Sequence, residues 1–371
     1  MPAKPLRIPH DLVEAGLVTA DRLPALARVA ERYALAITPA MTELIDPDDP
    51  ADPIARQFVP TEAELTTSPN ETADPIGDLA NSPVEGIVHR YPDRVLLKLT
   101  HTCAVYCRFC FRREMVGPEG LGTLTSEAMT TALAYISEHG EIWEVILTGG
   151  DPLVLSPRRL RETMAALAGI EHVKVVRLHT RMPVVDPDAV TDELVAALKC
   201  EGKAVYVALH ADHPRELTPR ARAACARLVD AGLPMLGQSV LLKDVNDDPE
   251  VLGQLMRAMV ETRIKPYYLH HADLAPGTGH FRTTLAEGQA VMRAMRGRLS
   301  GLCQPTYVLD IPDGFGKVPV GPCHVESTIG EAVLIEDWRG LKHIYPRGID
   351  SRLARGSPLI KPTDFDRNGN G

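Results

Sequence analysis

The chain has 371 residues, a length that fits one large domain with additions or two domains. Its formal net charge of -9 supplies no overall basic field for nucleic acid, and no run of about 18 apolar residues predicts a membrane span. Hydrophobic residues make up 44% of the chain, enough for a buried core. The N-terminal residues lack the apolar stretch of a signal peptide, so we expect a cytoplasmic protein.

The first part of the chain differs in pattern from the rest. Residues 1 to about 45 predict short amphipathic helices. Residues 46–88 are rich in Pro, Asp and Thr, and they predict an ordered connector on the surface rather than part of the core. We therefore expect a helical N-terminal extension with its connector over residues 1–88, a main domain over 89–300 and a C-terminal segment over 301–371.

Short apolar runs alternate with helical patterns from Arg94 onward. Thr218 and Asp248 each precede a proline, which is a typical start of a helix between two such runs. Strands separated by helices predict βαβ units and a parallel sheet, either a partial (β/α)6 barrel or an open doubly wound sheet. In both folds, functional residues gather where strands end. The predicted strands are 94–100, 143–149, 173–179, 204–210, 234–242 and 265–271.

The C-terminal segment returns to strand patterns. Residues 331–346 read EAVLIEDWRGLKHIYP and predict a β-hairpin with Gly340 in its turn. The fold class is therefore α/β, with a helical extension before the sheet and a β-hairpin after it.

Three of the seven cysteines share one short segment, with the spacing C-x3-C-x2-C at Cys103, Cys107 and Cys110. Three thiolates from one loop can hold three irons of a four-iron cluster and leave the fourth iron open. A zinc site is the alternative, with His101 as fourth ligand, but zinc usually takes pairs of C-x2-C and no second pair exists. We expect the remaining cysteines to be packing residues: Cys200, Cys225, Cys303 and Cys323.

Two glycine-containing segments also stand out. Gly149, Gly150 and Asp151 follow the second predicted strand, where glycines let the backbone approach a ligand closely. Lys317 follows Gly314 and Gly316 in a turn that lacks the spacing of a phosphate-binding P-loop. Alone, such a lysine is usually part of a solvated turn.

The cysteine segment, with Phe109 before its last cysteine, resembles the radical S-adenosylmethionine (SAM) superfamily. This resemblance implies a partial barrel of radical SAM type, a [4Fe-4S] cluster on the three cysteines, and SAM bound to the open iron. Gly149, Gly150 and Asp151 match the stretch that receives the methionine amino group. His210 matches a family histidine near SAM.

Several motifs in order resemble the lysine 2,3-aminomutase family over about residues 85–345. They are HRYPDRVLLKLTHTCAVYCRFCFRREMVG, LTGGDPL, GQSVLLKDVND, HFRTT and GKVPV. The resemblance implies a second cofactor, pyridoxal 5'-phosphate (PLP), with Lys317 as its Schiff-base lysine. It also implies that Arg90, Arg94 and Gln238 bind the cofactor phosphate.

The same resemblance implies the substrate and the reaction. Arg112 would bind the carboxylate of lysine, and Asp273 and Asp310 would receive its ε-ammonium. The implied reaction converts L-lysine to β-lysine by moving the amino group from carbon 2 to carbon 3. It needs an electron donor such as flavodoxin or ferredoxin, and we expect a homo-oligomer. No cysteine follows Cys323, so no structural zinc is expected.

Other readings of the sequence stay open at this point. A related branch makes β-lysine for elongation factor P, and an aminomutase for another amino acid would share most motifs. A radical enzyme without PLP and a non-catalytic iron–sulfur module would both explain the cysteines. The module would leave Arg112, Asp273, Asp310 and Lys317 unexplained.

Overall fold

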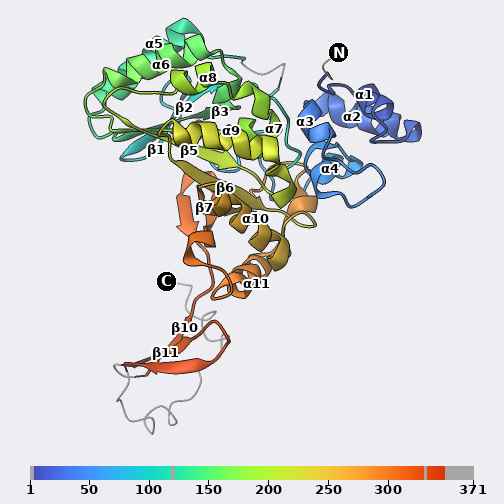
Figure 1. Ribbon diagram of the computed structural model, residues 1–371, viewed down its shortest axis with the longest axis vertical. Helices are drawn as coiled ribbons and strands as arrows, with labels where there is room; N and C mark the ends of the chain where they lie inside the picture. The colour runs from blue at the N-terminus through green and yellow to red at the C-terminus, as the bar shows by residue number, and fades with distance from the viewer. Residues whose placement is uncertain (1–3, 118–121, 330–331, 347–371) are drawn as a thin grey trace.

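A wall of parallel strands forms the centre of the computed structural model, which describes residues 4–117, 122–329 and 332–346 (Figure 1). Neighbouring strands follow chain order in one sheet, and each pair from β2 to β8 is parallel. The parallel strands are β2 (Arg94–Thr100), β3 (Glu144–Gly149), β4 (Val175–Thr180), β5 (Ala204–His210), β6 (Met235–Leu241), β7 (Ile264–His271) and β8 (Thr306–Ile311). The first six confirm the predicted strands to within a few residues.

At least one helix follows each strand from β2 to β7, which confirms the partial (β/α)6 barrel. Capping residues start these helices: the side chains of Thr218 and Asp248, for example, accept hydrogen bonds from backbone N–H groups of the first turn. The helices are α5 (Ser126–Glu138), α6 (Pro157–Ala168), α7 (Met182–Val185), α8 (Asp192–Ala197), α9 (Pro219–Asp230), α10 (Pro249–Glu261) and α11 (Leu285–Met295). Their apolar faces and the outward side chains of the strands form the main core.

Two antiparallel strands that the sequence pattern did not predict flank the parallel sheet. Strand β1 (Ile87–Tyr91) pairs with β2, and β9 (Gly316–Pro319) pairs with β8. The segment RYPDR, which alone reads as a surface charge cluster, is the hairpin between β1 and β2. The β8–β9 register places Lys317 directly opposite Asp310.

Four short helices of the N-terminal extension lie together beside the barrel (Figure 1). They are α1 (Pro9–Glu14), α2 (Leu23–Arg32), α3 (Pro39–Thr42) and α4 (Pro53–Phe58). The expectation that residues 46–88 form a surface connector is wrong in part: residues 66–70 are exposed, but Ile54, Phe58, Glu64 and Asp78 are all fully buried. Acidic side chains tolerate burial only when they are paired, and their partners lie far along the chain.

Glu64 shows how this connector holds the cysteine segment. Its carboxylate accepts hydrogen bonds from Nε and Nη2 of Arg108 and from Nη2 of Arg113. Burial disfavours the charged form of Glu64, but the two guanidinium groups outweigh it and hold its pKa below the usual value. Since Arg108 lies between Cys107 and Cys110 and Arg113 follows Cys110, the pairing fixes the chain on both sides of Cys110.

The C-terminal strands form a separate sheet that extends away from the barrel (Figure 1). It contains β10 (Val325–Ile329), β11 (Ala332–Glu336) and β12 (Lys342–Tyr345). The predicted hairpin is confirmed: β11 and β12 are antiparallel, and Gly340 has a φ of 82° in the turn between them. The domain boundaries at residues 88 and 300 stay predictions.

Two further expectations can be compared with the described residues. Within them, no helix is long and apolar enough to cross a membrane. Cys200, Cys225 and Cys303 are buried as packing residues, whereas Cys323 is exposed, so the packing prediction is wrong for Cys323.

Replacing Glu64 with Gln should lower the free energy of unfolding by about 3 kcal/mol, because it leaves Arg108 and Arg113 buried without a charge partner. Urea-induced unfolding followed by circular dichroism measures this change. Glu62 is a matched control on the same turn: its side chain is 60% exposed, so Glu62→Gln should change stability by no more than about 0.5 kcal/mol. Equal losses of stability in the two variants would contradict the conclusion that Glu64 stabilises the fold by pairing with Arg108 and Arg113.

Candidate active site

A cavity of about 620 Å³ lies inside the barrel, a volume typical of small-molecule sites. Parallel strands end at the same edge of the sheet, so residues distant in sequence meet there. All the site residues proposed from the sequence line this cavity: Arg90, Arg94, Cys103, Cys107, Phe109, Cys110, Arg112, Gly149, Gly150, Asp151, His210, Gln238, Asp273, Asp310 and Lys317. The structure therefore brings the whole predicted set together, although the role of each residue stays a prediction.

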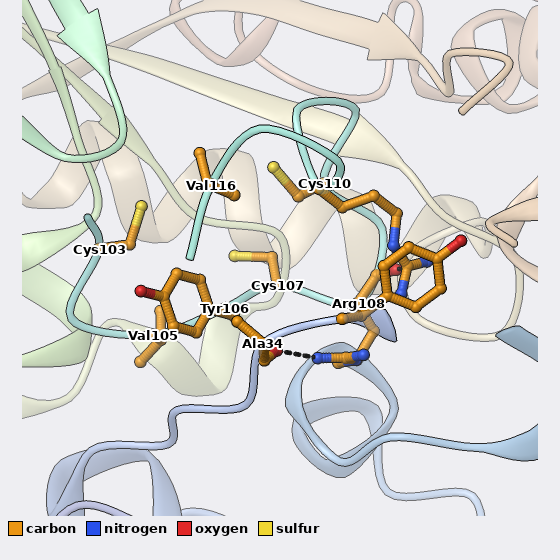
Figure 2. Close-up of a pocket in the computed structure, with 10 residues that line it drawn as sticks. Ala34, Cys103, Val105, Tyr106, Cys107, Arg108, Cys110 and Val116 are labelled. Carbon is orange, nitrogen blue, oxygen red and sulfur yellow. Dashed lines mark hydrogen bonds between the residues drawn. The ribbon is translucent and has the colours of Figure 1, made fainter. Parts of the chain in front are cut away.

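The three clustered cysteines lie on the loop after β2, and their sulfur atoms turn toward a common space (Figure 2). All three are free thiols. Burial raises the pKa of each thiol, to about 11 for Cys107, so a positively charged group is needed to bind them as thiolates. Among the described residues, no three His, Cys, Asp or Glu side chains are arranged to hold a single metal ion.

Arg181, which sequence reasoning missed, contacts the cysteine loop directly. Its Nη1 lies 2.9 Å from Sγ of Cys107, and its Nη2 donates to Oε1 of Gln57 and Oε2 of Glu216, both at 2.7 Å. Arg181 follows β4, so this buried guanidinium connects the barrel, helix α4 and the cysteine loop. A single arginine after a strand carries no sequence signal that would single it out.

The glycine pair after β3 is required by close packing. A Cβ atom on Gly149 would lie 2.3 Å from the carbonyl oxygen of Thr100, and one on Gly150 would lie 2.2 Å from that of Thr102. Asp151 is also held by the protein, since its carboxylate accepts hydrogen bonds from Thr180 Oγ1 and from the backbone N–H of Arg181. The segment thus fixes the start of the cysteine loop, and its contact with SAM stays a prediction.

His210 and Phe109 line the cavity near the cysteines. Nε2 of His210 lies 2.9 Å from Oδ2 of the buried Asp212, which orients the imidazole. The ring of Phe109 lies 5.8 Å from that of His210 and forms an edge contact with Phe281. These contacts give the cavity an aromatic side close to the cysteines.

Lys317 faces an acidic side chain across the β8–β9 hairpin. Its Nζ lies 2.5 Å from Oδ2 of Asp310, and its backbone N–H donates to the hydroxyl of Tyr91 at 2.7 Å. The preceding turn has positive φ at Asp313 and Gly314, which reverses the chain within a few residues. The hairpin therefore presents an amine inside the cavity instead of the solvated turn that the sequence alone suggests.

A second acid lies near this pair. Burial raises the pKa of Asp273 to about 7, and the charge of Asp310 adds to this increase. Two neighbouring carboxylates in a low-dielectric cavity favour a cation between them.

Arginines supply the opposite charge elsewhere on the wall. Arg112 and Arg90 both pair with the buried Asp78, a residue that the motifs do not include. Arg94 pairs with Asp93 at 2.6 Å, and its guanidinium stacks 3.8 Å from the ring of Tyr91. The cavity thus has cationic and anionic regions that could bind a molecule with both charges.

Comparison with known proteins identifies the family. The model for the Radical SAM superfamily matches residues 97–255, and the model described as Lysine-2,3-aminomutase matches residues 292–355. L-lysine 2,3-aminomutase from Clostridium subterminale is 39% identical over 90% of this chain and 80% of its own. The chain belongs to the lysine 2,3-aminomutase family of the radical SAM superfamily.

Other relatives show the range of this family. L-lysine 2,3-aminomutase from Escherichia coli K12 is 32% identical over 84% of this chain and 91% of its own. Glutamate 2,3-aminomutase from Clostridioides difficile is 37% identical over 85% of this chain and 74% of its own. Among solved structures, a radical SAM methyltransferase from Sphaerobacter thermophilus is similar over part of its length: the match is 20% identical, covers 60% of this chain and 68% of that chain, and has a TM-score of 0.44.

The family uses a [4Fe-4S] cluster, SAM and PLP, and the residues of this cavity fit the cluster and PLP. The converging thiols of Cys103, Cys107 and Cys110 suit the cluster. The cavity extends from these cysteines to Lys317, an amine positioned for a carbonyl cofactor. Arg90 and Arg94 line the same cavity and supply charge for a phosphate.

Changing any one of Cys103, Cys107 or Cys110 to Ala should strongly reduce the iron content and abolish reductive cleavage of SAM. Iron analysis and chromatography of 5'-deoxyadenosine measure the two effects. Cys225→Ala is the matched control, because Cys225 is fully buried in helix α9 and is not among the residues lining the cavity. A cysteine variant that still cleaves SAM at the wild-type rate would remove that residue from the ligand set.

Proposed function

We propose that this enzyme converts L-lysine to β-lysine by a 2,3-migration of the amino group. One observation carries the proposal: Asp273 and Asp310 lie together beside Lys317 in a cavity that also exposes Arg112. Lysine has a carboxylate at one end and an ammonium at the other, which complements these charges. The family membership supports the same reaction, since several relatives have the name L-lysine 2,3-aminomutase.

The acids also favour lysine over glutamate, the substrate in the name of another relative. A glutamate side chain would bring a carboxylate to Asp273 and Asp310, where like charges repel. An unpaired charge in a buried site is strongly disfavoured, so these residues reject an acidic substrate as well as attracting a basic one.

When bound, SAM and the cluster would supply a carbon-centred radical, and PLP would supply a conjugated π-system. The chain's own residues position the substrate. We infer that Arg112 binds its carboxylate, that Asp273 and Asp310 bind its ε-ammonium, and that Lys317 would hold PLP. Fixing both ends of a flexible substrate keeps carbons 2 and 3 in place. An external electron donor and a homo-oligomer stay predictions.

The raised pKa of Asp273 predicts a dependence of substrate binding on pH. Below about pH 6 the carboxyl of Asp273 is largely protonated, and it ionises as the pH rises through about 7. Since the ionised form attracts an ammonium, the KM for L-lysine should fall by about tenfold between pH 6 and pH 8. Asp273→Asn should have a raised KM that no longer changes over this range. A variant that kept the wild-type pH profile would exclude Asp273 as the titrating group.

Anaerobic turnover tests the function itself. The reconstituted enzyme is incubated with SAM, PLP, dithionite and L-lysine, L-ornithine or L-glutamate, and products are separated by chromatography and identified by mass. We expect β-lysine from L-lysine without net loss of SAM, and much lower turnover of the other two. Lys317→Ala, with matched cofactor loading, should lose the visible absorption band of bound PLP. No amino acid product, with the band unchanged in Lys317→Ala, would overturn the proposal.

A further inference from the structure

Asp78 is a fully buried acid that lies behind the cavity wall and belongs to none of the motifs. We propose that Asp78 is a positioning residue, which fixes the guanidinium of Arg112 for the carboxylate of the amino-acid substrate. This inference rests on the proposed function and adds to it a residue from the N-terminal connector. Asp78 acts through Arg112 and has no contact with the substrate itself.

The geometry of the contact is specific. Oδ2 of Asp78 accepts hydrogen bonds from both Nε and Nη2 of Arg112, at 3.0 and 2.9 Å. Two hydrogen bonds to one planar guanidinium fix its direction as well as its place, which a single bond would not do. The Nη1 group of Arg112 then remains for a substrate carboxylate.

The other carboxylate oxygen of Asp78 binds a second arginine of the cavity wall. Nη2 of Arg90 donates to Oδ1 of Asp78 at 3.0 Å, while its Nη1 lies 3.6 Å from Oδ1 of Asp310. Asp78 thus separates two guanidinium groups that would otherwise repel each other. The same chain of charges reaches Asp310 and Lys317, so the cationic and anionic ends of the cavity share one network.

The backbone around Asp78 is itself held in place. Its N–H donates to Oδ1 of Asp74 at 2.8 Å, and its carbonyl accepts from Oγ of Ser82 at 2.8 Å. The preceding Gly77 packs against the turn before Lys317, because a Cβ at Gly77 would lie 2.6 Å from the backbone nitrogen of Gly314. The carboxylate therefore has a fixed position relative to both the barrel and the Lys317 turn.

Asp78 is charged in this environment. Burial disfavours its ionised form, but Arg112, Lys98 and Arg90 outweigh burial and lower its pKa below the usual value. A neutral side chain of the same shape would therefore lose the ionic part of the contact while keeping its volume. This difference allows the positioning role to be measured separately from packing.

Three variants make the test: Asp78→Asn removes the charge, Asp78→Glu keeps it, and Asp52→Asn is the matched control. Asp52 is also fully buried in the connector, but it pairs with Arg215 at 2.6 Å and is not among the residues lining the cavity. The dissociation constant for L-lysine is read from the change in the visible spectrum of bound PLP, and KM and kcat are measured in parallel. Iron and PLP contents report whether each variant is folded and loaded.

We expect Asp78→Asn to raise the dissociation constant and KM for L-lysine by tenfold or more, with kcat changed by less than threefold. Asp78→Glu should recover part of this loss. Asp52→Asn should lower thermal stability but leave lysine binding within twofold of wild type. The inhibition constant of 1,5-diaminopentane, which keeps both amino groups but lacks the carboxylate, should change by less than twofold in Asp78→Asn.

A double variant shows whether Asp78 acts through Arg112. In an Arg112→Gln background, Asp78→Asn should weaken lysine binding by less than a further twofold. Full additivity of the two changes, or equal lysine binding in Asp78→Asn and Asp52→Asn, would overturn the proposal. If the spectrum of the wild-type enzyme changes with another amino acid and not with L-lysine, the proposed substrate is wrong. The variants are then compared with that amino acid, because it presents the same carboxylate to Arg112. If no amino acid changes the spectrum of the wild-type enzyme, both the proposed function and the role of Asp78 are overturned.

Discussion

The pairing of buried connector carboxylates with arginines of the cysteine loop is the interaction on which the site depends. Glu64 binds Arg108 and Arg113, and Asp78 binds Arg112. These arginines follow or surround the cysteines in a segment that has little regular structure of its own. Hydrogen bonds and ion pairs of these side chains therefore hold the backbone of this loop in place, as the backbone hydrogen bonds of a helix or strand do elsewhere. Because buried charges are stable only in pairs, the N-terminal extension and the barrel depend on each other.

The barrel adds a second constraint, which is the convergence of strand ends. The cysteines follow β2, Arg181 follows β4, His210 ends β5 and Asp273 follows β7. Each of these residues is positioned by a different strand, so one cavity combines thiols, aromatic rings and side chains of both charges. Such a mixture suits chemistry that must hold a zwitterionic substrate in one orientation.

Much of this architecture could be predicted from local pattern. The six apolar runs and their helix starts predicted a parallel sheet, and the resemblance to the radical SAM superfamily predicted that it forms a partial barrel. The spacing of Cys103, Cys107 and Cys110 indicated the loop that could hold a cluster. The antiparallel strands β1 and β9 were missed because each is short and carries charged or glycine residues. Asp78 and Arg181 were missed for another reason: their partners lie 34 and 74 residues away, and pairing over such distances leaves no periodic signal.

Lys317 lies late in the chain, so during synthesis the cysteine loop is made before the lysine of the cavity. Gln57, Glu64 and Asp78 emerge before the cysteines that they or their partners support, whereas Lys317 lies on β9, the last strand of the barrel sheet. A nascent chain therefore contains its thiols and their connector contacts well before it contains the amine for PLP. A chain that ended after β8 would keep the cysteine loop but would have no lysine at the position opposite Asp310.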